Sequence, residues 1–288
     1  MTSDQRISIA HRAFLAPPAP LLKRITLALL ALSLIALITQ TSVSSMSNEE
    51  RFSELQSLNW TEVYHDPCTG NWEGGWFLDG LRASVDNTPG GMVLSAGPIA
   101  KDHASHCVLW TKQSFEGDLK IEFDYWRIDT IQQFVNIIYI QATGIEKGPF
   151  TKDIAEWSEL REIPYMRSYF MNMKALHISF AAFGADPSEE DYVRLRRYPR
   201  GEDQKFTEIA VMPDNLNTGL FKPGIKHRFT IIKKGDEVLF HVATDEKTLV
   251  FAWNTSDYDP ITEGRIGLRH MWTRCSRYAD FKVSKLSE

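Results

Sequence analysis

The sequence predicts an all-β fold, a two-sheet antiparallel sandwich or jelly roll with short helical insertions. From residue 58 onward, short segments rich in β-branched and aromatic residues alternate with Gly, Pro, Asn and Asp, as strands and turns do. Strands and helices do not alternate, so a parallel sheet is not expected. The 288 residues are 43% hydrophobic, which is enough for one large core.

Nine segments have the length and composition of strands. In chain order they cover residues 119–128, 134–142, 175–184, 191–198, 226–234, 237–243, 248–254, 264–271 and 277–285. The segment KKGDEV between two of them predicts a tight hairpin, because Gly235 tolerates the positive φ that such turns require. Many strands with regular turns indicate two stacked sheets.

Two segments predict helices. Residues 47–58 fit a short amphipathic helix in which Ser47 is the N-cap and Glu50 stands three residues later, as in a capping box. Residues 150–163 fit a second helix within a long insertion between strands. No repeat or linker follows residue 50, so residues 46–288 are expected to form a single domain.

The first 45 residues differ in composition from the rest. Arg12, Lys23 and Arg24 precede the mostly apolar residues 25–38, and a small polar stretch follows. This order is typical of a secretory signal, and the apolar run is shorter than the roughly 20 residues of a membrane-spanning helix. We expect export to the periplasm or beyond. Two alternatives stay open: an uncleaved membrane anchor, and translation from Met46, which would give a cytoplasmic protein.

Charge and motif content exclude several classes of protein. The net charge of −5 argues against a nucleic-acid binder, which would carry a basic excess, and membrane contact is expected only through an uncleaved N-terminal segment. Cys68, Cys107 and Cys275 show no metal-ligand spacing, and a metal at His103 and His106 lacks a further ligand. No phosphate-binding loop, dinucleotide fingerprint or zinc motif occurs. We therefore expect no metal and no cofactor.

The segment EGRIGLRHMWTRCSRYADFKVSKL resembles the closing strands of concanavalin A-like jelly rolls, in which a G-x-I-G-L/F-R strand precedes one ending in Y-x-D/N-F-x-V. Further segments match the same group in the same order along the chain: residues 106–126, 173–184 and 251–271. Together they resemble the YesU-like family of that superfamily, over about residues 58–286. Members tend to be encoded among genes for plant or algal polysaccharide breakdown, so the resemblance implies a jelly roll and a carbohydrate substrate. Segments 144–172 and 185–225 depart most from the family and are expected to set substrate preference.

The segment 192–200 carries four arginines and no acid. Alternation along a strand gives it two faces, one with Tyr192, Arg194, Arg196 and Tyr198 and the other with Val193, Leu195 and Arg197. Because guanidinium groups match carboxylate or sulfate geometry, Arg194 and Arg196 are expected to bind an anion. A charged edge strand that guards against aggregation is the alternative. Arg197 is expected to reach a carboxylate or solvent.

Other candidate residues lie mostly in segments that match the family. His177 shares a strand face with small residues just before the arginine-rich strand, and His106 begins a matching segment. Purely structural roles are the alternative for both, and His270 is expected to be a core histidine. Further candidates offer aromatic or hydrogen-bonding groups suited to sugars: Tyr125, Arg127, Tyr169, Asn172, Tyr192 and Arg274. Arg127 must reach the sheet rim or a partner, and Arg274 could instead pair with an acid.

These residues favour an enzyme acting on acidic, uronate-containing oligosaccharides by β-elimination, which means a lyase or a dehydratase. Arg194 or Arg196 would hold the uronate carboxylate and make the neighbouring C–H more acidic. His177 would remove that proton, and Tyr169 or Tyr192 would protonate the leaving oxygen.

Two alternatives stay open. A non-catalytic carbohydrate-binding module fits the fold equally well. A glycoside hydrolase would need an unusual pair of carboxylates, such as Glu122 with Asp124 or a residue of 150–162, because the Glu-x-Asp-x-x-Glu strand of jelly-roll glycosidases is absent.

Overall fold

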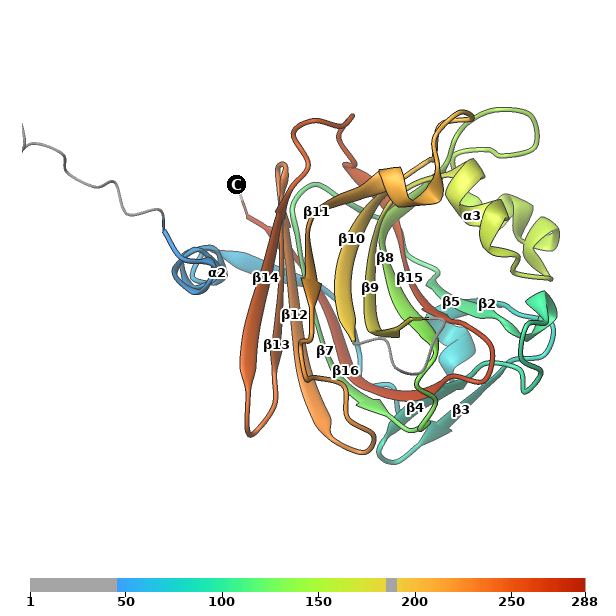
Figure 1. Cartoon of the computed structure of the whole chain (residues 1–288), viewed down its shortest axis with the longest axis horizontal. Coiled ribbons are helices and arrows are strands. Elements are labelled where there is room, and N and C mark those ends of the chain that lie inside the picture. The colour runs from blue at the N-terminus through green and yellow to red at the C-terminus, as the bar shows by residue number, and fades with distance from the viewer. Residues whose placement is uncertain (1–45, 185–190, 288) are drawn as a thin grey trace, which may run out of the picture. The chain divides into compact units, whose positions relative to one another are not determined.

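The computed structural model describes residues 46–184 and 191–287 (Figure 1). Contacts divide the chain into two units, residues 1–46 and 47–288, and every element named below belongs to the second. The expected signal or anchor, residues 1–45, lies outside the described residues, so export and its alternatives stay predictions. In the described ranges, no helix is long and apolar enough to cross a membrane.

One antiparallel sheet, sheet A, has the strand order β14-β13-β12-β7-β16-β4-β3, and β1 pairs with β16. Its strands are β1 Trp60–Asp66, β3 Ser84–Thr88, β4 Gly91–Ser95, β7 Leu119–Arg127, β12 Lys226–Lys234, β13 Glu237–Ala243, β14 Thr248–Asn254 and β16 Cys275–Leu286. The predicted hairpin at Gly235 joins β12 to β13, with φ of 55° at the glycine.

The second antiparallel sheet, sheet B, has the order β11-β10-β9-β8-β15-β5-β2, and β6 pairs with β15. Its strands are β2 Trp76–Asp79, β5 Cys107–Thr111, β6 Phe115–Glu116, β8 Phe134–Gly144, β9 Met173–Phe183, β10 Tyr192–Tyr198, β11 Ala210–Leu216 and β15 Glu263–His270. The two sheets form the predicted all-β jelly-roll sandwich, and the fold class is confirmed.

The core between the sheets follows from the alternation of side chains along strands. In β7 each second residue from Leu119 to Arg127 is buried and the others are half-exposed. Phe123 of sheet A packs into the same core as Ile178 and Leu268 of sheet B. Burial of such side chains contributes about 1.5–3 kcal/mol each, so this layer holds the two sheets together.

Several elements of the structure had no predicted counterpart. They are β1, β2, β3, β4, β6, β11 and the helix α3 (Met166–Asn172). The missed strands are short or half-exposed: β2 has four residues, and no residue of β3 is fully buried. Their alternation of apolar and polar residues is too weak to reveal a strand.

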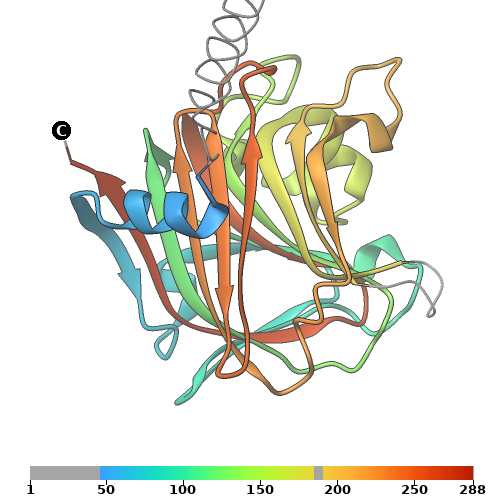
Figure 2. The same ribbon diagram turned by 60° about the vertical axis from the view of Figure 1, so that its left-hand side comes forward.

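The first predicted helix is α2 (Asn48–Gln56), which lies across strands of sheet A (Figure 2). Ser47 Oγ accepts from the Glu50 backbone N–H at 3.1 Å, and Glu50 Oε2 accepts from the Ser47 N–H at 2.8 Å. This is the predicted capping box. Phe52 and Leu55 attach the helix to an apolar patch on sheet A: Ile232, Leu239 and Val250.

We expect Ser47→Ala to lower the free energy of unfolding by about 1 kcal/mol, because the first-turn N–H groups lose their acceptor. Denaturant unfolding measures this. Ser53→Ala in the middle of the same helix is the matched control, since Ser53 is exposed and alanine is the better helix former. Equal effects of the two substitutions would contradict a capping role.

The second predicted helix is a 3₁₀ helix, η3 (Ile154–Arg161), within the insertion that joins β8 to β9. Trp157 interrupts helical geometry with φ of −126°, and its indole N–H donates to the Thr151 carbonyl at 3.0 Å. The insertion thus contains η3 followed by α3.

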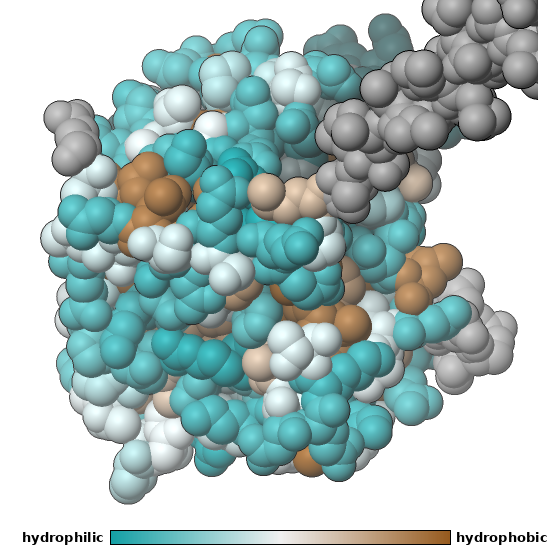
Figure 3. All heavy atoms as spheres, turned by 90° about the vertical axis from the view of Figure 1, so that its left-hand side faces the viewer, coloured by the Kyte–Doolittle hydropathy of each residue, from teal (hydrophilic) through white to brown (hydrophobic). Residues whose placement is uncertain are grey.

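The outer face of sheet A is polar. Figure 3 looks at the side where α2 and β14 lie in Figure 1; hydrophilic residues cover most of it and apolar patches are small and separate. Asp124 of β7 pairs with Lys226 at 2.7 Å, and Glu122 lies 3.3 Å from Lys120. Both carboxylates of the suggested hydrolase pair are therefore engaged with cations.

Candidate functional site on the outer face of sheet B

The outer face of sheet B carries a second buried cluster, separate from the core between the sheets. Sheet residues, residues of the β8–β9 insertion and one residue between β10 and β11 (Ile209) contribute to it: Val108, Trp110, Ile137, Tyr139, Ala142, Ile154, Trp157, Tyr169, Met173, Ala175, Tyr198 and Ile209. Figure 1 shows α3 lying beside this sheet. Because the insertion covers part of the face, polar side chains that would otherwise be in water are buried there.

His177 lies in the middle of this face. The register places it between Tyr139 of β8 and Arg196 of β10. Its Nδ1 is 2.5 Å from Tyr198 Oη, and its Nε2 is 2.8 Å from Ser179 Oγ. A neutral imidazole donates from one nitrogen and accepts at the other, so hydroxyl partners satisfy both nitrogens in either tautomer.

The electrostatic surroundings fix the protonation states of this pair. Burial lowers the pKa of His177 well below 6.5, and the guanidinium groups of Arg196, Arg269 and Arg194 lower it further. The imidazole is therefore neutral at physiological pH. Burial raises the pKa of Tyr198 well above 10. The site thus presents a neutral imidazole beside a protonated hydroxyl.

Strand β10 divides its side chains as the sequence predicts. Val193 and Leu195 belong to the core between the sheets, and Tyr198 belongs to the outer-face cluster. Arg197 differs from expectation, because it reaches neither a carboxylate nor solvent. It is 8% exposed and donates to the backbone carbonyl of Asp259 at 2.8 and 3.2 Å.

The two arginines of this face have different partners. Arg194 donates to both carboxylate oxygens of Asp214, at 2.6 and 2.5 Å, so its charge is balanced. Arg196 is 5% exposed; its Nη1 donates to Ser179 Oγ at 3.1 Å and its Nε has no partner. It forms no ion pair with any carboxylate of residues 46–184 and 191–287. A buried cation without a counter-ion is costly, and none of the carboxylates in the described ranges supplies one here.

Arg269 of β15 is in the same situation. It is fully buried, and its Nη2 donates to the Pro164 carbonyl at 2.8 Å and to His106 Nδ1 at 3.0 Å. The Tyr169 ring lies 4.5 Å from the guanidinium carbon. Its Nε and Nη1 have no partner, and the described part of the chain supplies no carboxylate to pair with it.

Asp79 of β2 anchors the insertion to the sheet. Its carboxylate accepts from Arg161 Nε at 2.7 Å and Tyr169 Oη at 3.0 Å, both from the insertion, and from Trp110 Nε1 at 2.7 Å. Burial raises the pKa of Asp79, while these donors act against that increase. The hydroxyl of Tyr169, a predicted catalytic group, is thus directed at Asp79.

Three half-buried apolar side chains, which we call the roof, pack onto the outer-face cluster. Met166 and Phe170 come from α3, and Phe206 comes from η4 (Phe206–Ile209). Phe206 lies 4.7 Å from the Arg196 guanidinium carbon and 5.0 Å from the Phe170 ring. His177, whose ring is edge-on to those of Tyr139 and Tyr198, is only 1% exposed.

Three predicted site residues have structural partners away from His177. Tyr125 lies in the core between the sheets, where its hydroxyl is 2.9 Å from Asn136 Nδ2. Arg127 and Arg274 both donate to Asp129, from Nε at 3.2 and 3.0 Å. All three side chains are buried. The sequence predicted that Arg127 would reach either the sheet rim or a partner, and it pairs with Asp129.

The remaining predicted residues are placed as follows. Tyr192 is half-exposed and its ring lies 4.7 Å from the Arg194 guanidinium carbon. Asn172 is half-exposed at the end of α3, where its carbonyl accepts from the Ile145 N–H. His270 is fully buried and its Nε2 lies 2.8 Å from Tyr278 Oη, which confirms it as a core histidine.

Sequence reasoning missed four residues of this site: Tyr139, Tyr198 as a partner of His177, Arg269 and Asp79. Tyr139 and Arg269 lie on predicted strands. Alternation alone would have placed Tyr139 on the same strand face as Ile137, and Arg269 on the same strand face as Gly267. Asp79 lies on the missed strand β2. No local signal connects it with the insertion.

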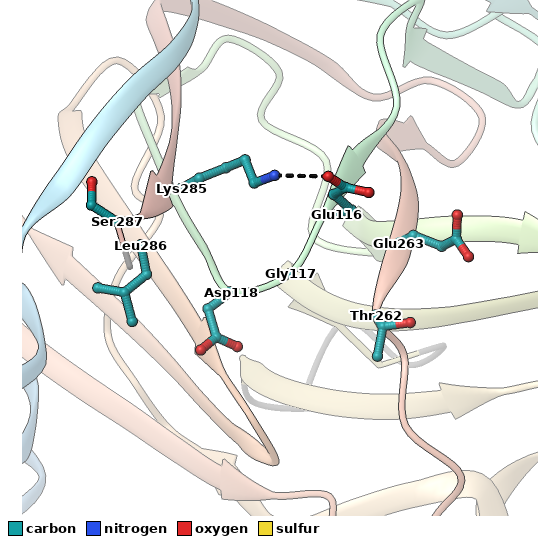
Figure 4. Close-up of a pocket in the computed structure, with 8 residues that line it drawn as sticks. All are labelled: Glu116, Gly117, Asp118, Thr262, Glu263, Lys285, Leu286 and Ser287. Atoms are coloured by element: carbon teal, nitrogen blue, oxygen red, sulfur yellow. Dashed lines mark hydrogen bonds and ion pairs between the residues drawn. The ribbon is translucent and has the colours of Figure 1, made fainter.

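An open groove of about 700 Å³ lies apart from this face, and Figure 4 shows its lining. Glu116 of β6 and Glu263 of β15 stand directly opposite each other there. Lys285 pairs with Glu116 at 3.0 Å, and Lys152 pairs with Glu263 at 2.7 Å. The groove is therefore charged but largely neutralised, and none of its lining residues belongs to the outer-face cluster. Within the described residues, no group of three or more His, Cys, Asp or Glu side chains could hold a metal ion.

Two stacked antiparallel sheets, with a buried cluster on one outer face, define a jelly-roll protein. The chain belongs to the family described as a domain of unknown function, DUF1961, whose model matches residues 64–283. The finer resemblance to the YesU-like family stays a prediction. No curated protein matches the chain.

Solved structures show the same fold at low sequence identity. A protein of unknown function with a galectin-like fold from Bacillus subtilis is 19% identical, with a TM-score of 0.59, over 80% of this chain and all of that one. The exoplasmic/lumenal domain of VIP36, in a Ca²⁺/Man₃GlcNAc-bound form, is 10% identical, with a TM-score of 0.52, over 80% of this chain and 91% of that one.

Proposed function

We propose that this protein binds an acidic carbohydrate on the outer face of sheet B and acts on it by β-elimination. The observation that carries the proposal is the pair of buried guanidinium groups of Arg196 and Arg269, which have no ion-pair partner among the described residues. In strand order they flank His177 and Tyr139. Two unbalanced buried charges beside a neutral histidine favour an anionic ligand.

The carbohydrate class is supported by the fold and by the resemblance of the sequence. The VIP36 domain was solved with a mannose-containing sugar and Ca²⁺. In our proposal, arginine side chains recognise the sugar, and this requires an acidic group on it. Arginine forks suit carboxylate and sulfate alike.

The proposed reaction uses groups already held in place. Arg196 pairs with the uronate carboxylate and makes the hydrogen on the adjacent carbon more acidic. The neutral imidazole of His177 accepts that proton, the C–H electron pair forms a C=C bond, and the C–O bond at the β carbon breaks. The leaving oxygen takes a proton from Tyr198. Cleavage at a glycosidic oxygen makes the protein a lyase, and loss of a hydroxyl as water makes it a dehydratase. Entry of substrate requires the roof to move.

Mass spectrometry with ultraviolet absorbance after incubation with oligosaccharides of galacturonate, glucuronate and mannuronate tests the proposal. We expect an unsaturated, ultraviolet-absorbing product from one of these sugars. His177→Ala should lower the rate at least a hundredfold, because general base catalysis contributes about 10²–10⁴. Trp126→Phe on sheet A is the control and should leave the rate unchanged. Unaltered sugars in every incubation would contradict the elimination.

A non-catalytic binding module is the second candidate, and the burial of His177 favours it. In that case the acidic sugar binds but is recovered unchanged, and binding survives His177→Ala. A hydrolase would release reducing ends without an unsaturated product. The same mass spectra therefore separate all three functions.

The pKa of His177 offers a test that does not depend on activity. Burial and Arg196 both hold this pKa below 6.5, so Arg196→Gln should raise it while leaving the ring buried. Titration of the imidazole signals by NMR measures the change. Arg200→Gln, half-exposed on the same chain segment, is the control. An unchanged or lower pKa in Arg196→Gln would contradict the proposed electrostatic coupling.

A further inference from the structure

A second group of unpartnered polar atoms lies on the outer face of sheet B, beyond β15 from His177. The atoms are His106 Nε2, Trp272 Nε1, and Arg269 Nε and Nη1, all buried and all without a hydrogen-bond partner. The three side chains are neighbours: the His106 and Trp272 rings stack at 4.6 Å, and Arg269 Nη2 is 3.0 Å from His106 Nδ1. We call these three residues the rim cluster.

Every unpartnered atom of the rim cluster is a donor. Indole and guanidinium nitrogens only donate. His106 Nδ1 lies 3.0 Å from Arg269 Nη2 and 3.3 Å from the Pro164 carbonyl oxygen. We assign Nδ1 as the acceptor of the shorter contact, because a guanidinium group can only donate. Burial with the charge of Arg269 lowers the pKa of His106 to about 3. The neutral ring then has its proton on Nε2. Buried donors without acceptors are costly, and the ligand that suits them has acceptors only, such as a carboxylate or a sulfate.

Two exposed rings connect the rim cluster with the surface. Tyr165 is 43% exposed, and its ring lies 4.3 Å from that of His103, which is also exposed. His103 is edge-on to His106 at 5.5 Å. Tyr165 directly follows Pro164, whose carbonyl binds Arg269. Aromatic rings of this kind pack against sugar rings, so a sugar unit placed on them has its acidic group near the donors.

We infer that the rim cluster is a second anion subsite, and that the ligand is an oligosaccharide with acidic groups on at least two of its sugar units. This inference rests on the proposed function. Arg196 holds one acidic group beside His177, and Arg269, His106 and Trp272 hold another. The side chain of Arg269 lies between Tyr169 and His106 and links the two subsites, so the minimal ligand spans both.

Calorimetric titration with mono- and trisaccharides of the same uronate panel tests this subsite. Trp272→Phe keeps a ring and removes one donor, and His106→Phe does the same at the neighbouring position. Each should weaken trisaccharide binding about tenfold, as loss of a hydrogen bond to a charged group does. Trp126→Phe is the matched control on sheet A and should bind like the wild type.

Wild-type trisaccharide affinity in both rim variants would overturn the subsite and leave the proposed function intact. Failure of the wild type to bind any acidic sugar would instead overturn the proposed function, and the subsite with it. The indole N–H signal of Trp272 in NMR spectra, identified by its loss in Trp272→Phe, gives a readout on the unaltered protein. It should shift when the trisaccharide is added, and a fixed signal during saturating binding contradicts the subsite.

Discussion

Asp79→Ala should destabilise the protein by about 3–5 kcal/mol, the cost of leaving a buried charge unpaired. Arg161 and Asp79 are both fully buried and lie 2.7 Å apart. The substitution also leaves Tyr169 and Trp110 without their acceptor. The free energy of unfolding from denaturant titration measures the loss. Because the insertion is held to sheet B at this carboxylate, we expect proteolysis within residues 145–172 to accelerate as well.

Two further variants separate charge burial from packing. Asp79→Asn combined with Arg161→Met removes both charges and keeps an acceptor for Tyr169 and Trp110, so it should cost less than Asp79→Ala alone. Glu146→Ala breaks the exposed pair with Lys174 and should change stability by less than about 1 kcal/mol. If Asp79→Ala cost no more than this exposed control, Asp79 would not be the anchor.

Asp129→Ala should have an effect of similar size, about 3–5 kcal/mol. Arg127, Arg274 and Asp129 are all nearly fully buried, so the substitution leaves two neighbouring cations without a counter-ion. It also removes the acceptor of the Ile131 and Cys275 N–H groups. Denaturant unfolding at pH 7 measures the loss. Glu237→Ala, at a partly exposed pair with Arg51, is the control.

The cost of Asp129→Ala should depend on pH. Burial alone would raise the pKa of Asp129, but Arg274, the Cys275 N–H and Arg127 outweigh it and bring the pKa below 3.8. A depressed carboxyl pKa stabilises the folded state above the unfolded pKa, and that stabilisation is lost as the pH falls through the folded pKa. The stability difference between wild type and variant should therefore shrink below about pH 4. A constant difference from pH 7 to pH 2 would contradict this assignment.

Local sequence patterns predicted much of the fold and one wall of the site. Alternation in β10 separated Arg196 from Val193 and Leu195, because neighbouring side chains of a strand must point to opposite faces. The same rule placed His177 beside Ser179. The capping box at Ser47 was also visible, since its two hydrogen bonds join residues three positions apart.

Local sequence patterns could not predict which residues these side chains contact. Tyr198 contacts His177 across 21 positions, and Arg161 and Tyr169 contact Asp79 across 82 and 90. Arg127 and Arg274 were predicted to bind sugar because of their side-chain type, yet both pair with the buried carboxylate of Asp129. Whether an arginine faces a ligand or an aspartate depends on which distant strands lie side by side.

The sequence by itself determined the jelly-roll class, most of the longer strands and the arginine face of β10. These follow from hydrophobic periodicity and turn chemistry, which act over a few residues. Only the tertiary structure decided that no carboxylate of the described residues pairs with Arg196 or Arg269, that Arg194 pairs with Asp214, and that the insertion covers part of the outer face of sheet B. Burial and ion pairing are properties of the packed sheets, because they depend on segments that meet only when the chain is folded.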